Sequence, residues 1–273
     1  MKHALFVRLV RALQRKEKGF LCLDTHAGRG SYDLATAAVG DSLAREPEWP
    51  GGIGKLVAAN DATTATAEYV SLIREFDRRQ GNLEPTLRFY PGSPWIARLL
   101  LRPQDRLVLC EKHDAECAAL RAEFRGEPGV AVHEIDGYRS LRAMLPPPER
   151  RALVLIDPPY EEQGEFKQIT ASLREGLQRL ASGVFAVWYP LTERARVEEF
   201  FATVVALKPP PTLAAELTVA GENAPIKMKG SGLLVINPPW RFADEAREAL
   251  AYLAPALAQS PGGGSRVDWL VSG

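Results

Sequence analysis

The segment 153–160, LVLIDPPY, ends an apolar run on an aspartate, two prolines and a tyrosine. Because each proline fixes φ and lacks an N–H, we expect the backbone carbonyls beside Asp157 to stay out of a helix and face a cleft. An exocyclic amino group carries two N–H bonds. Asp157 can accept one and the Pro158 carbonyl the other, which turns the nitrogen lone pair toward an electrophile. Tyr160 offers a ring face for stacking a flat base, although the alternative is a kinked loop whose tyrosine packs on the core.

The segment 24–30, DTHAGRG, follows an earlier strand-like run and contains two glycines spaced by one residue. Gly28 and Gly30 allow a tight turn and a close approach of a ligand to the backbone. The pattern is not GxGxxG, and no lysine follows at P-loop spacing. Asp24 opens the loop, where a carboxylate could hold the amino group of a ligand. The alternative is an ordinary glycine-rich turn between a strand and a helix.

Acidic residues also end the next two strand-like runs. Glu111 could accept both hydroxyls of a ribose, because a carboxylate offers two acceptor oxygens; the alternative is an acid at a helix N-terminus. Asp136 and Gly137 could meet the N6 edge of an adenine ring, although Asp-Gly is also a common turn dipeptide.

Strand-like and helix-like segments alternate along the chain, which predicts a doubly wound, mostly parallel α/β sheet. In such sheets, ligands bind beyond the carboxyl ends of the strands, where the residues above would meet. The last two strand-like runs have no helix between them, so we expect a hairpin and one antiparallel edge strand. The expected strands are 20–24, 106–111, 130–136, 152–157, 184–190, 215–220 and 232–238, and the expected helices include 4–15, 114–126 and 166–180.

The first two expected strands are separated by far more chain than one helical crossover needs. We therefore expect residues 40–90 to form an inserted helical subdomain over the carboxyl edge of the sheet. Residues 1–39 and 91–273 would form the main domain. The segment 91–102 predicts a returning helix, with Ser93 at the N-cap and Pro94 at the first helical position.

The composition is that of an ordinary soluble globular protein, with 273 residues, 46% hydrophobic and 25% charged. Lys+Arg and Asp+Glu balance at 34 each, which argues against a histone-like coat but not against a local basic patch. Three cysteines without a CxxC pair favour buried thiols in a reducing cytoplasm, and four scattered histidines have no zinc spacing, so we expect no metal. No apolar stretch is long enough for a membrane span.

In this order, the glycine loop, Glu111, the Asp-Gly pair and the DPPY motif resemble those of class I S-adenosylmethionine-dependent methyltransferases acting on an amino nitrogen. More narrowly, the chain resembles the J-type 23S ribosomal RNA adenine-N6 methyltransferases, the RlmJ family. The blocks that carry this resemblance span nearly the whole chain: KHALFVRLVRALQRKEKGFLCLDTHAGRGSYDL, YPGSPWIARLLLRPQDRL, EIDGY, LVLIDPPYE, VFAVWYP and SGLLVINPPW.

The resemblance implies a seven-stranded Rossmann-like methyltransferase sheet and methyl transfer from S-adenosylmethionine to N6 of an adenine in 23S ribosomal RNA. It implies that Asp157 is the catalytic residue and proton acceptor, beside Pro158 and Tyr160. The cofactor contacts that it carries over are His3, His26, Ser93, Glu111, Asp136, Gly137 and Asp157, to which the glycine loop adds Asp24 and Gly28.

We expect substrate contacts from Lys2, Tyr160, Arg29, Lys227 and Lys229, with a solvated surface charge as the alternative for the last three. The motif NPPW at 237–240 is interpreted as structural or as part of an RNA-facing wall. Members of the family usually carry a short segment before the position of Lys2 that approaches the substrate, whereas this sequence starts at Met1, directly before Lys2. We expect this difference to affect RNA contact and turnover more than cofactor binding. The alternatives are a DNA adenine-N6 methyltransferase, a poorly active RNA-binding member, or methylation of a protein glutamine or small amine. We expect a cytoplasmic monomer.

Overall fold

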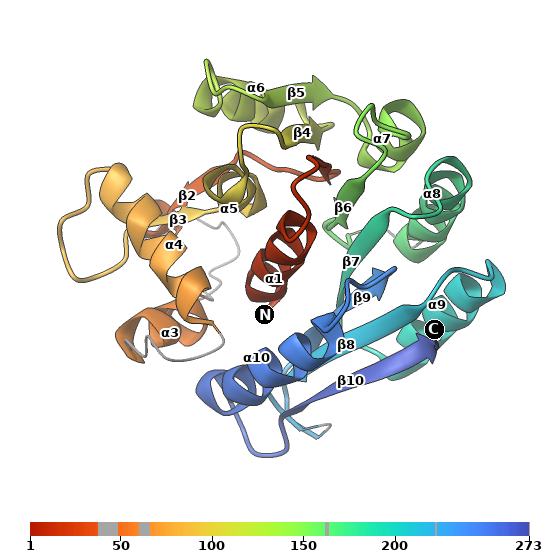
Figure 1. Cartoon of the computed structure of the whole chain (residues 1–273). Helices are drawn as coiled ribbons and strands as arrows, with labels where there is room; N and C mark the ends of the chain where they lie inside the picture. The colour runs from red at the N-terminus through yellow and green to blue at the C-terminus, as the bar shows by residue number, and fades with distance from the viewer. Residues whose placement is uncertain (38–48, 60–65, 162–163, 222, 273) are drawn as a thin grey trace.

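The computed structural model describes residues 1–37, 49–59, 66–161, 164–221 and 223–272. In this part of the chain, one eight-stranded sheet has the order β10-β8-β9-β7-β6-β1-β4-β5, and a two-stranded sheet pairs β2 with β3 (Figure 1). The strands are β1 Leu21–Asp24, β2 Ser31–Asp33, β3 Phe89–Pro91, β4 Arg106–Glu111, β5 Val130–Glu134, β6 Ala152–Ile156, β7 Val184–Pro190, β8 Thr212–Thr218, β9 Gly230–Ile236 and β10 Gly264–Val271. The helices are α1 Lys2–Gln14, α2 Leu34–Ala37, α3 Ile53–Ala59, α4 Ala67–Arg79, α5 Ser93–Leu100, α6 Asp114–Glu123, α7 Gly137–Met144, α8 Glu165–Arg179, α9 Arg194–Ala206 and α10 Phe242–Leu257, with a 3-10 turn at Trp49–Gly51.

The strands β5, β4, β1, β6 and β7 are parallel neighbours. Strands β1 and β6 are buried at every position, as the apolar sequence runs predict for strands covered on both faces. Helices cover the two faces in two groups. One hydrophobic cluster packs α1, α5, α6 and α10 on one face, and the other packs α7, α8 and α9 on the opposite face. The predicted doubly wound α/β fold is confirmed.

The antiparallel part of the sheet differs from the sequence prediction in its position. Strand β9 runs antiparallel to both neighbours and lies between β7 and β8, so the reversed strand of the predicted hairpin is internal. The edge is formed by β10, an eighth strand that pairs antiparallel with β8. Polar and charged residues alternate with Val267 and Trp269 in β10, and this weak apolar signal gave no strand prediction.

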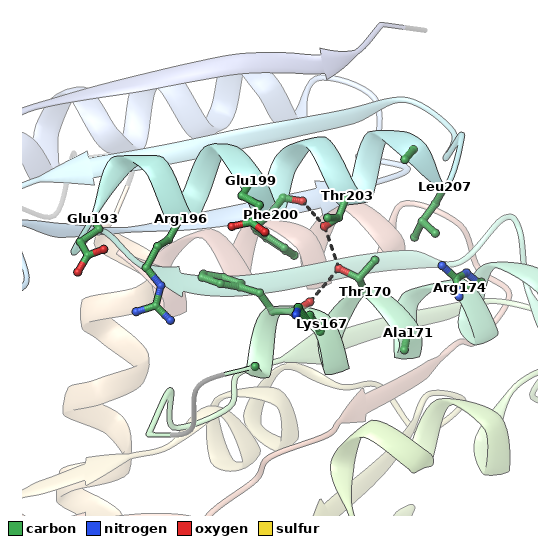
Figure 2. A pocket seen from close by; sticks show the side chains of 13 residues that line it. Lys167, Thr170, Ala171, Arg174, Glu193, Arg196, Glu199, Phe200, Thr203 and Leu207 are labelled. Carbon is green, nitrogen blue, oxygen red and sulfur yellow. Dashed lines mark hydrogen bonds between the residues drawn. The ribbon is translucent and has the colours of Figure 1, made fainter.

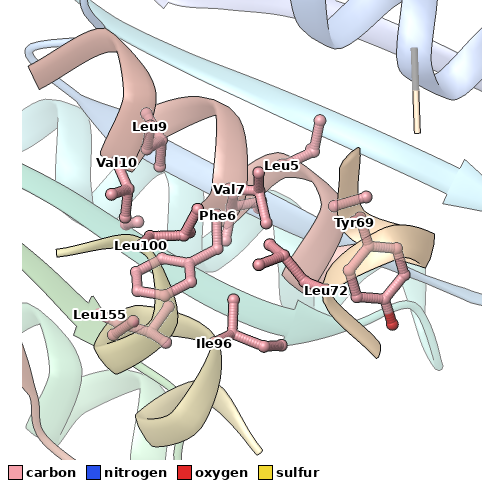
Figure 3. Close-up of a cluster of buried hydrophobic side chains, with 14 of the residues drawn as sticks. Leu5, Phe6, Val7, Leu9, Val10, Tyr69, Leu72, Ile96, Leu100 and Leu155 are labelled. Carbon is pink, nitrogen blue, oxygen red and sulfur yellow. The ribbon is translucent and has the colours of Figure 1, made fainter. Parts of the chain in front are cut away.

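The predicted insertion, as far as it is described, packs against the main body. Tyr69 and Leu72 of α4 lie in the same apolar cluster as α1 and α5 (Figure 3). Strand β3 returns the chain to α5, whose first residue is Ser93, with Gly92 at the N-cap. The predicted N-cap position of Ser93 and first helical position of Pro94 were therefore each wrong by one residue, since Ser93 is the first helical residue and Pro94 the second. The division into a main domain and a 40–90 subdomain stays a prediction, and 40–48 and 60–65 lie outside the described residues.

None of the helices in the described ranges is long and apolar enough to cross a membrane.

Candidate active site

The carboxyl ends of three adjacent parallel strands bring the predicted acidic residues to one edge of the sheet. Asp24 is level with Leu109 of β4 and Leu155 of β6 in the pairing register. Glu111 is therefore two residues beyond this level on one side, and Asp157 two residues beyond it on the other. This common edge is what the alternating strand pattern predicted.

Asp24 is a buried carboxyl group at the end of β1, with only 1% of its surface exposed. Its Oδ1 accepts a hydrogen bond from the His26 backbone N–H at 3.3 Å, whereas Oδ2 is buried without a hydrogen-bond partner among the described residues. The pKa of Asp24 is raised to about 6, mainly by burial and also by the charge of Asp157, while a hydrogen bond from the Ser93 side chain and the charge of Lys2 partly offset the rise. A ligand amino group would satisfy the unpartnered oxygen and favour the ionised carboxylate.

Glu111 connects the end of β4 to the glycine loop. Its Oε2 accepts the Gly28 N–H at 2.9 Å, and its Oε1 accepts the His113 N–H at 2.8 Å. Gly28 has φ +60, and a Cβ there would lie 2.9 Å from the Tyr32 hydroxyl, so both conformation and space favour glycine. Each carboxylate oxygen keeps a free lone pair, so Glu111 can still accept hydrogen bonds from the hydroxyl groups of a ligand.

The Asp136–Gly137 pair begins α7. Asp136 is the N-cap, and its Oδ1 accepts the Tyr138 N–H at 2.8 Å. A Cβ on Gly137 would lie 2.1 Å from the Thr25 carbonyl oxygen and 2.7 Å from the His26 ring. The loop after β1 and the start of α7 therefore meet at a place that only glycine fits.

His26 lies between these two segments. Its ring packs edge-on against Tyr138 at 4.9 Å between centroids, and its Nδ1 lies 2.7 Å from the Thr25 hydroxyl. Burial lowers the pKa of His26 to about 4 despite the opposing influence of Asp157, Glu111 and Asp136. The imidazole is therefore neutral at physiological pH and can donate or accept one hydrogen bond to a ligand.

His3, near the start of α1, belongs to a buried chain of aromatic side chains. Its Nδ1 lies 2.6 Å from the Tyr90 hydroxyl, which lies 2.8 Å from the Tyr69 hydroxyl. Its Nε2 is buried without a partner among the described residues, and burial lowers the pKa of His3 well below its usual value. Sequence reasoning missed Tyr69 and Tyr90, because their contact with His3 depends on how the inserted segment packs.

The DPPY motif lies directly beyond β6. Asp157 forms an ion pair with Lys2, whose Nζ lies 5.8 Å from the centroid of the Trp188 ring. Tyr160 has φ +58, donates its hydroxyl to the Trp188 carbonyl, and packs edge-on against the Trp188 ring at 5.6 Å. Trp188 was not predicted as a site residue, although it stands near the carboxyl end of the expected strand 184–190. The structure thus brings Lys2, Asp157, Tyr160 and Trp188 together.

The other predicted substrate contacts are more scattered. Arg29 donates to both carboxylate oxygens of Glu116, at 3.0 and 2.7 Å, so its charge is already paired within the protein. Lys227 is exposed, and Lys229 directly precedes β9. Because β9 is antiparallel to β7, its first residues lie at the same edge as Asp157.

The NPPW motif lies at the opposite edge of the sheet, because it follows the carboxyl end of the reversed strand β9. Asn237 has φ +54, and its Nδ2 donates to the carbonyls of Ala181 and Gly183 at 2.7 and 2.8 Å. This supports the structural interpretation of the motif.

Comparison with known proteins places these features in a family. A family model described as "Ribosomal RNA large subunit methyltransferase D, RlmJ" matches residues 17–271. The chain is 36% identical over 271 residues to "Ribosomal RNA large subunit methyltransferase J" of Escherichia coli strain K12, covering 99% of this chain and 94% of that one. It is 37% identical over 270 residues to the Haemophilus influenzae protein of the same name, covering 99% and 93%.

A solved structure also resembles the whole chain. The crystal structure of protein LPL1258 from Legionella pneumophila superimposes with a TM-score of 0.85 at 34% identity, covering 98% of this chain and 94% of that one. The likeness therefore extends over nearly the whole chain.

Proposed function

We propose, because the chain belongs to the RlmJ family of ribosomal RNA large subunit methyltransferases, that it transfers a methyl group from S-adenosylmethionine to N6 of an adenine in 23S ribosomal RNA. The observation that carries this proposal is the position of Asp157 and the Pro158 carbonyl. They lie at the carboxyl edge of the sheet, one strand away from the buried Asp24 and two from Glu111.

The residues at this edge fit the cofactor chemically. Asp24 offers an unpartnered buried oxygen for an amino group, and Glu111 keeps acceptor capacity for the ribose hydroxyls. Gly137 lets the start of α7 pack closely against the Thr25 carbonyl. This brings Asp136 next to the loop after β1, where it could meet an adenine edge. We assign further cofactor contacts to His3, His26, Gly28, Ser93 and Asp157. S-adenosylmethionine, when bound, supplies an electrophilic methyl group on a sulfonium.

On the substrate side, the target adenine must leave its stack to reach the edge of the sheet, as enzymes that modify a base require. Asp157 and the Pro158 carbonyl would each accept one N–H of the amino group, and Asp157 would take the proton that the nitrogen loses. Tyr160 would contact the ring. Because no bond to the protein forms, the residues act by positioning and by electrostatic alignment.

Lys2 bears directly on this geometry. Its ammonium donates to Asp157, the same carboxylate that the proposal gives to the target amino group. Substrate entry must therefore share or replace this contact, which is a substrate-facing role for Lys2. Arg29, Lys227 and Lys229 are proposed to contact RNA phosphates from the surrounding loops. Action in the cytoplasm and as a monomer belongs to the same proposal.

The proposal is tested by methyl transfer to matched RNA and DNA hairpins, with wild type and Asp157→Ala. We expect N6-methyladenine in RNA only, and no transfer by a variant that still binds S-adenosylmethionine in a calorimetric titration. Near wild-type transfer by Asp157→Ala would remove the assigned role of this residue. Preference for the DNA hairpin would replace RNA with DNA as the substrate.

A further inference from the structure

Helices α8 and α9 enclose a groove of about 900 Å³, and none of the predicted site residues is among its described lining residues (Figure 2). Its base is formed by phenylalanine rings and threonine hydroxyl groups. The rings of Phe166 and Phe200 stack at 4.6 Å between centroids, and the hydroxyls of Thr170 and Thr203 lie 3.2 Å apart. Phe200 is only 1% exposed, and both hydroxyls donate to backbone carbonyls of their own helices. The half-buried Phe166 is therefore the ring that a ligand could contact.

Three basic side chains line this groove: Lys167 and Arg174 from α8, and Arg196 from α9. All three are exposed, and within the described ranges none of them forms a salt bridge. Neighbouring arginines behave differently, since Arg194 is bound by both Glu198 and Glu216. These three side chains can therefore bind an anion from outside the protein, such as a phosphate group.

The acidic residues of the groove do not cancel these charges. Glu193 and Glu199 also line it, so the formal charge of the described lining residues is positive by one. Glu193 stands at the N-cap of α9, and Glu199 lies on the α9 side (Figure 2). On the α8 side, the charged side chains among the described lining residues are Lys167 and Arg174.

The groove continues from the DPPY loop. Tyr160 and Phe166 pack at 5.4 Å between ring centroids, so the aromatic base of the groove touches the motif that carries Asp157. Helix α8 follows β6 and starts at Glu165, on the same edge of the sheet as Asp157. Lys167 and Arg174 are seven residues apart on α8, which places them on one face about 10 Å apart along the axis. A strand of about three stacked nucleotides spans that length.

We propose that this groove binds the RNA strand that flanks the target adenine, with Lys167, Arg174 and Arg196 contacting its phosphates. The inference rests on the proposed function and adds to it a path for the substrate strand. The target base enters beside Asp157, and the adjoining nucleotides follow the surface between α8 and α9. None of the RNA contacts predicted from the sequence lies on α8 or α9.

The test is the variant Lys167→Ala/Arg174→Ala/Arg196→Ala, assayed on unmethylated 23S ribosomal RNA transcribed in vitro, with saturating S-adenosylmethionine. We expect the KM for RNA to rise by about tenfold or more near physiological salt, with kcat at saturating RNA and cofactor affinity unchanged. The slope of log affinity against log salt should fall by about two, because three phosphate contacts on a single strand are lost.

The matched control is Lys16→Ala/Lys18→Ala/Arg125→Ala, which removes the same charge from exposed positions at the opposite, amino edge of the sheet. It should keep the wild-type KM and salt slope. If the groove variant also keeps them, the inference is overturned while the proposed function stands. If wild type itself does not methylate the RNA, the proposed function fails, and the inference fails with it.

Discussion

At the residue scale, Asp24 shows how a ligand site costs stability. The free folded protein buries this carboxyl group with one oxygen unpartnered, and its pKa rises from 3.8 to about 6. Because the folded protein then holds the proton more tightly than the unfolded chain, the free energy of unfolding falls as pH rises from about 4 to about 6. The loss is complete above about pH 6 and amounts to about 3 kcal/mol, at about 1.4 kcal/mol per pKa unit.

Asp24→Asn should therefore increase the free energy of unfolding near pH 7.5, by up to about 3 kcal/mol, and the gain should vanish near pH 4. Urea denaturation at several pH values measures this, and the same variant should lose cofactor affinity. The contrasting control is Asp105→Asn. Burial raises the pKa of Asp105, but hydrogen bonds from Arg102 outweigh it and hold the pKa below its usual value, so this variant should be destabilised. An equal loss of stability for Asp24→Asn at every pH would contradict the account.

Gly137 provides a steric test of the cofactor site. Gly137→Ala would place a Cβ 2.1 Å from the Thr25 carbonyl oxygen, so the loop after β1 or the start of α7 must shift. We expect the affinity for S-adenosylmethionine to fall by about tenfold or more, since an ångström of displacement is enough to lose several ligand contacts. Titration calorimetry measures it. Gly264→Ala, where a Cβ meets nothing within 4 Å, should leave affinity unchanged. Equal affinity in both variants would remove the junction from the cofactor site.

Individual residues at strand ends were predictable from sequence, whereas their neighbours were not. Asp24, Glu111, Asp136 and Asp157 each follow an apolar run, and parallel pairing brings such positions to one edge. Tyr90 and Trp188 contribute through tertiary contacts that no local pattern encodes. Their roles emerge only when α1 is docked, because Lys2 meets Trp188 and His3 meets Tyr90.

At the element scale, the segment predicted as an insertion, 40–90, contacts the candidate site through β3. Tyr90 of β3 and Tyr69 of α4 form the hydroxyl chain that ends on His3 Nδ1. If Tyr90 donates to Nδ1, the proton resides on Nε2, and His3 presents a donor to an anionic or carbonyl group. Tyr90 and Tyr69 would thus fix the tautomer of His3, which we propose as a cofactor contact.

Tyr90→Phe should therefore weaken S-adenosylmethionine binding by roughly fivefold, the equivalent of one hydrogen bond, with kcat unchanged at saturating cofactor. The comparison is Tyr252→Phe, which removes a hydroxyl from α10 that forms no hydrogen bond with His3, Tyr69 or Tyr90. Cofactor affinity and kcat are measured separately for both variants. A Tyr90→Phe enzyme with wild-type affinity would reduce the hydroxyl chain to a packing role.

The alternation of strands and helices predicted the parallel part of the sheet. The positions of the C-terminal strands in the sheet could not be predicted from local sequence. Strand β9 is inserted between β7 and β8, and the pattern of a hairpin does not reveal which member pairs inward. The start of α5 was misplaced by one residue because Ser93 is a favourable N-cap residue, yet Gly92 occupies that position.

At the scale of the whole molecule, a formally neutral chain still offers local cationic surfaces. Among the described residues, most arginines that form a side-chain hydrogen bond or ion pair are bound to carboxylates, as Arg29 and Arg194 are. By contrast, the three basic side chains of the α8–α9 groove form no salt bridge within the described ranges. A neutral protein that recognises RNA must do so through such restricted surfaces, and binding should depend on salt according to their number.

The central claim is tested most directly by mass-spectrometric mapping of N6-methyladenine in 23S ribosomal RNA from cells with and without this gene. The account predicts that deletion removes N6-methylation at one adenine, that the wild-type gene restores it, and that Asp157→Ala does not. An unchanged set of N6-methyladenines after deletion, or full restoration by Asp157→Ala, would contradict it.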